Sequence, residues 1–167
     1  AEDSGVFAEA ASTLAERIAS WPRGFVHRDY QSRNLMVQEH ADADPSLVWI
    51  DFQEALLGPR VYDLVALLND SYQSFDRSFV EARLDEYSEH HGLDAVGREA
   101  VGREFDTVTV QRKLKDAGRF VFIDRVRGNP AFLGFVEPTI EKVFGALERL
   151  DGDPTLDRLH ALLRRLL

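Results

Sequence analysis

The chain has 167 residues, 44% of them hydrophobic, and its 20 basic and 29 acidic residues give a formal net charge of −9. This length predicts a single domain over residues 1–167, and the acidic balance, with no strongly basic run, predicts no nucleic-acid partner. The lack of cysteine excludes disulfides and thiolate sites and favours a cytoplasmic location, and the lack of a long apolar run predicts no membrane partner.

The first part of the chain, residues 1–22, has the periodicity of an amphipathic helix. One face of that helix collects the apolar residues Val6, Phe7, Ala10, Ala11, Leu14 and Ile18. This segment contains no lysine and one glycine.

The next segment, HRDYQSRNLMV, carries His27, Asp29 and Asn34, and the later run LVWIDF adds Asp51. Kinases use a catalytic-loop Asp, an Asn five residues later that holds Mg²⁺, and a second Mg²⁺-binding Asp after a later strand. Asp29, Asn34 and Asp51 follow that order and spacing, which indicates a phosphoryl-transfer site. The competing interpretation is that His27 and Asp29 cap a loop and that Asp51 only ends a strand.

Two short apolar runs flank a polar turn in this region. Residues 35–37 follow Asn34 directly, residues 40–46 supply turn formers, and residues 47–50 lead to Asp51. This pattern predicts a hairpin with Asn34 at one end and Asp51 at the other. Two oxygen ligands would then meet at one edge, as Mg²⁺ requires.

Beyond Gly58 the pattern is helical throughout. The predicted helices cover residues 61–68, 76–91, 94–116 and 156–166, with a break at Gly118 before the apolar run 120–123, a turn at 128–130, and Pro138 and Pro154 near helix starts. His90, His91 and His160 have no acidic partner at metal-ligand spacing, so we expect no metal there.

The third helical stretch contains a basic cluster formed by Arg112, Lys113, Lys115 and Arg119. At helical spacing such a cluster favours a solvated face, with a patch that meets substrate or nucleotide charge as the alternative. The aromatic residues that follow favour core packing. The alternative is that some of them line an acceptor pocket together with Arg112, Glu137 or Tyr72, the aromatic candidates being Phe120, Phe122, Phe132 and Phe135.

Three segments together resemble a known family: HRDYQSRNLMV, WIDFQEALLGPRVYDLVALLNDSY and QRKLKDAGRF. They are similar to the aminoglycoside phosphotransferase and choline kinase-like superfamily, and within it to bacterial anomeric kinases of N-acetylmuramate and N-acetylglucosamine. The resemblance implies an α+β, mostly α fold, the C-terminal lobe of a protein kinase-like fold, with a small β-hairpin that carries the catalytic and metal residues and packs on a helical bundle.

The resemblance also implies roles for individual residues. Asp29 would be the base or orienter of the acceptor hydroxyl, Asn34 and Asp51 the Mg²⁺ ligands, and His27 a residue that fixes the catalytic loop. Asp63 would be the buried carboxylate that accepts hydrogen bonds from the backbone of that loop.

The chain departs from the family pattern at several positions. Arg28 stands where aminoglycoside kinases usually carry Gly. Gln31 stands where serine/threonine protein kinases carry a Lys that touches the transferred phosphate, and Arg33 could supply that contact instead. Gln53 replaces the Gly of the DFG triplet, which argues against an activation segment that flips.

A kinase of this type covers ATP with a Gly-rich turn and a strand Lys on an N-terminal lobe. Residues 1–23 leave no room for such a lobe. We therefore expect the chain to be the C-terminal lobe of a longer enzyme, with its own N-terminal lobe as a partner, and to fold without activity when isolated.

These observations predict an ATP- and Mg²⁺-dependent phosphotransferase that acts on a small-molecule hydroxyl. The resemblance favours the anomeric hydroxyl of an amino sugar in cell-wall sugar recycling. The alternatives are an aminoglycoside or choline-type kinase and, from another class, a non-catalytic lobe that binds a ligand or partner.

Overall fold

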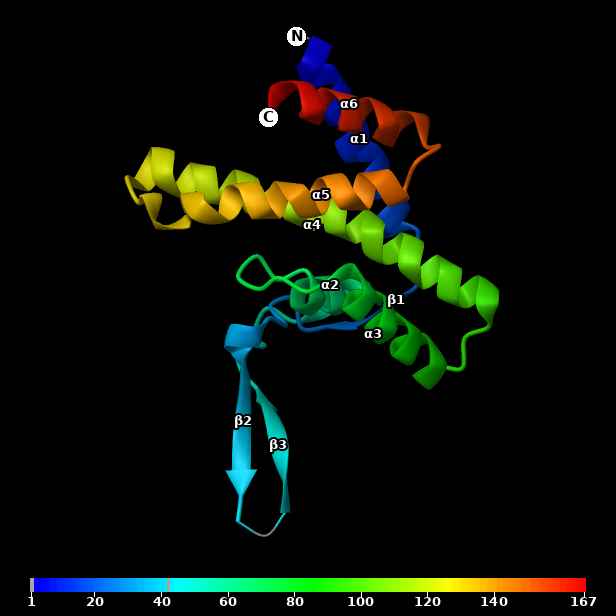
Figure 1. The fold of residues 1–167 in the computed structure, drawn as a ribbon, viewed down its shortest axis with the longest axis vertical. Helices are drawn as coiled ribbons and strands as arrows, with labels where there is room; N and C mark the ends of the chain where they lie inside the picture. The colour runs from blue at the N-terminus through cyan, green and yellow to red at the C-terminus, as the bar shows by residue number, and fades with distance from the viewer. Residues whose placement is uncertain (1, 42) are drawn as a thin grey trace.

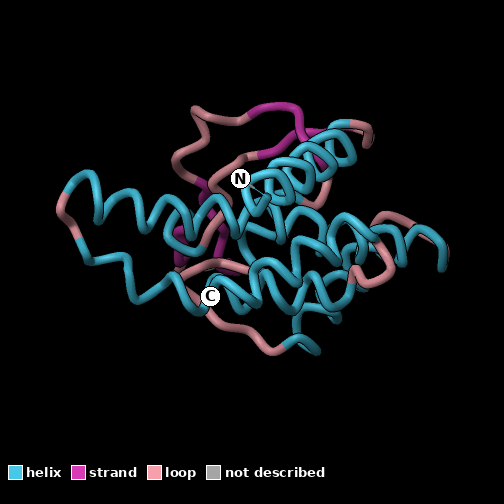
Figure 2. The backbone as a smooth tube through the Cα atoms, turned by 90° about the horizontal axis from the view of Figure 1, so that it is seen from above, coloured by secondary structure: helices cyan, strands magenta, loops and turns pink. Residues whose placement is uncertain are grey.

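A computed structural model describes residues 2–41 and 43–167 of the chain. It is mostly helical with two small antiparallel strand pairs, which agrees with the predicted α+β, mostly α class (Figures 1 and 2). The α-helices are α1 (Glu2–Ala19), α2 (Tyr62–Leu68), α3 (Arg77–His90), α4 (Ala95–Arg127), α5 (Val136–Arg149) and α6 (Pro154–Leu166). The strands and 3₁₀ helices are β1 (Arg23–Val26), η1 (Ser32–Asn34), β2 (Leu35–His40), β3 (Ala43–Trp49), β4 (Leu56–Pro59) and η2 (Pro130–Phe135).

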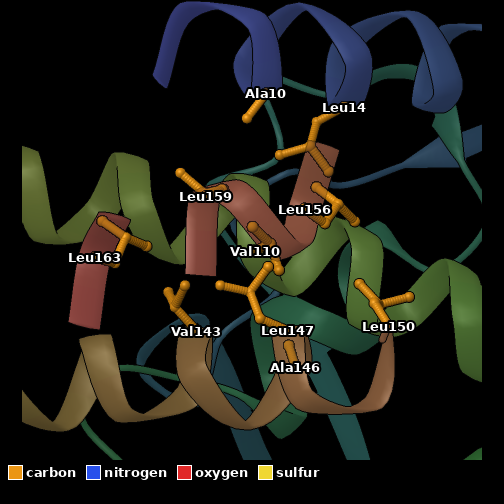
Figure 3. Close-up of a cluster of buried hydrophobic side chains, with 10 residues drawn as sticks. All are labelled: Ala10, Leu14, Val110, Val143, Ala146, Leu147, Leu150, Leu156, Leu159 and Leu163. Atoms are coloured by element: carbon orange, nitrogen blue, oxygen red, sulfur yellow. The ribbon is translucent and has the colours of Figure 1, made fainter. Parts of the chain in front are cut away.

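One hydrophobic cluster joins the two ends of the chain to the long helix α4. The apolar faces of α1 and α6 meet those of α4 and α5, and the side chains of Leu14, Val110, Leu147 and Leu159 pack between them (Figure 3). Each of these four side chains is 2% exposed or less, so each contributes about 1.5–3 kcal/mol of burial free energy. The predicted helices at both ends of the chain are therefore confirmed.

A second cluster fixes the helices that follow the strands. Val61 and Val65 of the α2 region pack with Leu84 of α3 and with Val101 and Phe105 of α4. Because α4 contributes to both clusters, it connects the terminal helices to the segment that carries the candidate site.

Helix α4 is continuous over 33 residues, so the predicted break at Gly118 is wrong. A glycine in a helix interior costs only about 1 kcal/mol relative to alanine. The packing of α4 on α5 and on the η2 region outweighs that cost (Figure 1). The helix ends at Gly128, whose φ of 64° gives a left-handed C-cap, in agreement with the predicted turn. No helix in the described ranges is both long and apolar enough to cross a bilayer.

The predicted hairpin is present, and its strands reach further into the expected turn than the sequence indicated. Strands β2 and β3 pair antiparallel, with Leu35 opposite Trp49 and Val37 opposite Leu47. A second pair, β1 with β4, was not predicted. The expectation that the hairpin packs on the helical bundle is wrong, because it projects away from the helices and is exposed along nearly its whole length (Figure 1).

Candidate active site

The loop after β1 carries the first candidate residues, and the carboxylate of Asp63 holds its backbone. Asp63 lies in the first turn of α2, and its two oxygens accept hydrogen bonds from the backbone N–H groups of His27 (2.7 Å) and Arg28 (3.0 Å). These are the contacts that the resemblance implies for Asp63, although its side chain is half-buried rather than buried. Arg28 has a left-handed φ of 75°, which turns the chain toward Asp29.

His27 is only 1% exposed, and its side chain is held by packing rather than by hydrogen bonds. Its ring meets that of Tyr30 edge-on at 5.8 Å between centroids, and neither ring nitrogen has a hydrogen-bond partner among the described residues. Tyr30 in turn contacts Trp49 at the base of the hairpin. Burial, with a smaller effect of the Asp63 charge, raises the pKa of Tyr30, so its hydroxyl stays protonated near neutral pH. This aromatic chain links the loop to β3.

Asn34 comes directly before β2 and Asp51 comes two residues after the end of β3, so both lie at the base of the hairpin, as predicted. The backbone N–H of Ile50 donates to the carbonyl of Asn34 (3.1 Å), which keeps the two ends together. The Asn34 amide nitrogen donates to the carbonyl of Asp29 (2.8 Å), so its amide oxygen faces away from that carbonyl. Asp51 has a left-handed φ of 66°, and one of its carboxylate oxygens accepts from Gln53 Nε2 (2.6 Å).

This donor set fits a hard divalent cation. One amide oxygen and one carboxylate are the ligand types that Mg²⁺ takes, with water and substrate phosphates completing its octahedron. No cluster of three or more His, Asp or Glu side chains suited to a metal occurs in the part of the chain that the structure describes. Asn34 and Asp51 could therefore hold Mg²⁺ together with a nucleotide, but they do not form a closed protein cage.

Asp29 and Asp51 line one cleft of about 360 Å³, here named the Asp29 cleft. Its other lining residues come from the loop after β1, from α2 and the loop that follows it, from α4 and from η2. They are Gln31, Ala66, Asp70, Ser71, Tyr72, Arg112, Lys113, Lys115, Asp116, Arg119, Phe120, Ile123 and Phe132. The Asp29 side chain is 45% exposed, and its Oδ1 lies 4.0 Å from Arg112 Nη2. A cleft of this volume is of the size that small-molecule sites occupy.

The basic cluster on α4 is divided, because Lys115 and Arg119 are exposed, as a solvated face predicts, whereas the other two residues are not. Arg112 and Lys113 are buried, at 6% and 2% exposure. The Arg112 guanidinium donates to the carbonyl of Arg28 (3.1 Å) and stacks on the ring of Tyr62 at 4.7 Å. The alternative interpretation, a patch that meets substrate or nucleotide charge, agrees with the position of these residues in the cleft wall.

Lys113 ties α4 to the loop after α2. Its ammonium group donates to Ser71 Oγ and to Asp116 Oδ2, both at 3.1 Å. Burial lowers the pKa of Lys113, and the Asp116 carboxylate partly opposes that effect. Lys113 is thus a charged group in the cleft wall that is already paired within the protein.

Asp70 is a cleft residue that the sequence analysis missed. Its carboxylate accepts from Ser32 Oγ and from the backbone N–H of Tyr72, both at 3.0 Å, and its backbone carbonyl accepts from Lys142. Asp70 lies two residues beyond the end of α2, so no helical periodicity around it signalled its role.

Other predicted candidates lie elsewhere. Arg33 is not in the cleft wall, and its guanidinium stacks on Tyr72 at 3.7 Å from the ring centroid. Glu137 is exposed and also outside the cleft. Phe120 and Phe132 do line the cleft, stacked at 5.8 Å, whereas Phe122 is 52% exposed and so is not the core residue that the aromatic pattern favoured.

A larger hollow of about 490 Å³ lies on the other side of the loop after α2, but it contains none of the predicted catalytic residues. Its two arginines, Arg77 and Arg149, both pair with the buried carboxylate of Asp106. The charge of these two arginines is therefore satisfied within the protein.

The chain is similar to several curated proteins named N-acetylmuramate/N-acetylglucosamine kinase. The protein from Pseudomonas aeruginosa is 38% identical over 119 residues, 69% of this chain and 34% of that protein. The one from Pseudomonas putida is 35% identical over 127 residues, 74% of this chain and 36% of that protein. The one from Neisseria meningitidis is 31% identical over 166 residues, 89% of this chain and 48% of that protein. The chain thus spans about a third to a half of the length of these relatives.

The sequence profile of the phosphotransferase enzyme family matches residues 2–100. The matched segment includes the loop after β1 with Asp29, the hairpin with Asn34 and Asp51, and the helix that carries Asp63. The chain belongs to the phosphotransferase enzyme family.

Proposed function

We propose that the chain supplies the catalytic and acceptor-binding residues of an ATP-dependent kinase whose acceptor is the anomeric hydroxyl of an amino sugar, N-acetylmuramate or N-acetylglucosamine. The observation that carries the proposal is the Asp29 cleft, where Asp29 and Asp51 lie opposite the basic face of α4. Family membership supports phosphoryl transfer, and the names of the relatives support the acceptor.

In the proposed reaction the acceptor oxygen bonds to the γ-phosphorus of ATP while the bond from that phosphorus to the β–γ bridging oxygen breaks. The proton of the acceptor hydroxyl passes to the carboxylate of Asp29, and ADP leaves. Mg²⁺, held by Asn34 and Asp51 together with the nucleotide phosphates, would neutralise charge on the phosphates. Arg112, 4.0 Å from Asp29, would add a fixed positive charge beside the transferring group.

The position of Asp29 depends on contacts made by the backbone around it. Asn34 holds the Asp29 carbonyl, and Asp63 holds the two N–H groups that precede Asp29. A base fixed in this way loses little conformational freedom when the acceptor binds, which is the contribution of positioning to catalysis.

The charge of the cleft does not separate the two kinds of acceptor. Helix α4 presents four basic residues to the cleft, and four acidic residues lie there as well. Three of the four cations, Arg112, Lys113 and Lys115, have a carboxylate within 4.0 Å. The choice of an amino sugar over a cationic aminoglycoside or choline therefore rests on the names of the relatives.

The relatives are two to three times longer than the segment they share with this chain. We propose that the chain is the C-terminal lobe of a kinase-like fold and that the residues that cover ATP lie outside residues 1–167. The 167-residue chain alone should then unfold cooperatively and show no ATP turnover. Robust turnover by this chain would contradict the proposal that the residues that cover ATP lie outside it.

The proposed function is tested with the full-length protein, ATP and each candidate acceptor. A glycosyl 1-phosphate loses phosphate in mild acid because the ring oxygen stabilises the resulting cation, whereas an aminoglycoside phosphate or phosphocholine is a stable ester. Phosphorus NMR before and after acid treatment should show an acid-labile product. Asp29→Asn should lower kcat at least about 100-fold, because a positioned base typically contributes about 10²–10⁴. An acid-stable product or a preference for aminoglycoside or choline would favour the runner-up, and no turnover of any acceptor would favour a non-catalytic lobe.

A further inference from the structure

The basic residues in the wall of the Asp29 cleft differ in whether the protein already neutralises them. They lie on one face of α4, at positions 112, 113, 115 and 119. Arg112 lies beside Asp29, and Lys113 and Lys115 share the carboxylate of Asp116, at 3.1 Å and 3.7 Å. Arg119 has no carboxylate within 4.0 Å among residues 2–41 and 43–167. Arg119 is therefore the cleft cation whose charge remains for a ligand.

The surroundings of Arg119 suit the arm of a sugar. Arg119 follows Arg112 by seven residues, about two helical turns or roughly 10 Å along α4, so it lies well away from the Asp29 end of the cleft. Phe120, Ile123 and Phe132 line the cleft at the same end, and the rings of the two phenylalanines are nearly parallel. This end of the cleft thus combines an apolar wall with one unneutralised guanidinium.

The two proposed acceptors differ in the group that such a site would recognise. N-acetylmuramate is N-acetylglucosamine with a lactyl ether on O3, which adds a methyl group and a carboxylate on the ring carbon next but one to the anomeric carbon. An arginine is the side chain best suited to a carboxylate, because its planar fork can donate two parallel hydrogen bonds.

We propose that Arg119 binds the carboxylate of an acidic amino sugar and so makes the lactyl-bearing acceptor the preferred one, with the aromatic wall beside it contacting the lactyl methyl group. This inference rests on the proposed function and deepens it by assigning the residue that selects between the two sugars. Lys115 is the nearest competitor for this role, but its ammonium group is already 3.7 Å from Asp116.

The experiment compares kcat/KM for N-acetylmuramate with kcat/KM for N-acetylglucosamine in the full-length protein. Wild type should prefer N-acetylmuramate, and Arg119→Ala should lower the ratio about tenfold, the value of one hydrogen bond to a charged group at a partly exposed site. The change should appear mainly as a higher KM for N-acetylmuramate. Arg119→Lys, which keeps the charge, should retain part of the preference.

Arg125→Ala is the matched control, because it removes the same charge from an exposed position of α4 outside the cleft. Circular dichroism establishes that each variant is folded, and Arg119→Gln replaces Arg119→Ala if the latter is not. The inference is overturned if wild type does not prefer N-acetylmuramate, if Arg119→Ala leaves the ratio within twofold of wild type, or if Lys115→Ala lowers the ratio and Arg119→Ala does not. If wild type phosphorylates neither sugar, the proposed function fails, and that result differs from an unchanged ratio in an active enzyme.

Discussion

Replacing Asp63 with alanine should destabilise the protein strongly, because it removes the carboxylate that holds the catalytic loop. Two backbone N–H groups donate to that carboxylate, from His27 at 2.7 Å and from Arg28 at 3.0 Å. A hydrogen bond to a charged group contributes about 1.5–3 kcal/mol, and a buried donor left unpaired costs a similar amount. His27 is buried, but Arg28 and Asp63 are only half-buried, so we take the lower end for both bonds and expect a loss of about 3 kcal/mol.

For a domain of 150–250 residues, each kcal/mol lowers Tm by about 2–4 °C, so Asp63→Ala should lower Tm by roughly 6–12 °C. Circular dichroism during heating of the 167-residue chain measures this shift, and urea unfolding gives the free energy independently. Asp85→Ala is the matched control, because Asp85 is an exposed aspartate on α3, and its change should stay within about 0.5 kcal/mol. If the two variants melt at the same temperature, Asp63 does not hold the loop and the reasoning is refuted.

Three further outcomes are expected. Asn34→Ala and Asp51→Ala should each raise the Mg²⁺ concentration that gives half-maximal turnover in the full-length protein, and a wild-type Mg²⁺ titration in both variants would remove them as ligands. Gly118→Ala should raise the free energy of unfolding by about 0.5–1 kcal/mol, because apart from its chain neighbours and its own helix backbone no atom of the described residues lies within 4 Å of the added methyl group. Gly128→Ala should lower it because φ there is 64°, and equal effects of the two changes in urea unfolding would contradict this. Burial lowers the pKa of Lys142 from 10.5 to about 8. Between these two pH values the unfolded chain binds more protons than the folded protein, so the free energy of unfolding should rise with pH in wild type but not in Lys142→Met. Parallel curves of unfolding free energy against pH for the two proteins would disprove this.

The parts of the fold that local pattern determines could be predicted from the sequence. The apolar faces of α1 and α6, the C-cap at Gly128, the helix start at Pro154, and the strands next to Asn34 and Asp51 all depend on residues close together in the chain. The order and spacing of Asp29, Asn34 and Asp51 likewise pointed to a segment that contributes to the cleft, although Asn34 itself is not one of the lining residues.

The features that the sequence analysis predicted wrongly or missed depend on contacts between segments that are distant in the chain. The burial of Arg112 follows from a carbonyl 84 positions earlier in the chain, and helical periodicity carries no information about that partner. The partners of Asp70 lie in the catalytic loop and in α5, so a sequence window around Asp70 could not reveal its role. The continuity of α4 through Gly118 depends on packing against α5 and η2, which a propensity argument does not include.

Two opposing contributions to the free energy of folding depend on which residue occupies position 28: the cost of its left-handed backbone and the gain from its side-chain contacts. A residue with a Cβ costs about 1–2 kcal/mol in this conformation, and glycine avoids that cost, which gives a physical reason for the glycine that aminoglycoside kinases usually carry there. Arginine instead contributes a guanidinium that pairs with Glu54, three residues after Asp51. Sequence divergence at position 28 can therefore move between glycine and long polar residues, but not toward valine or isoleucine, whose branched Cβ the left-handed region excludes.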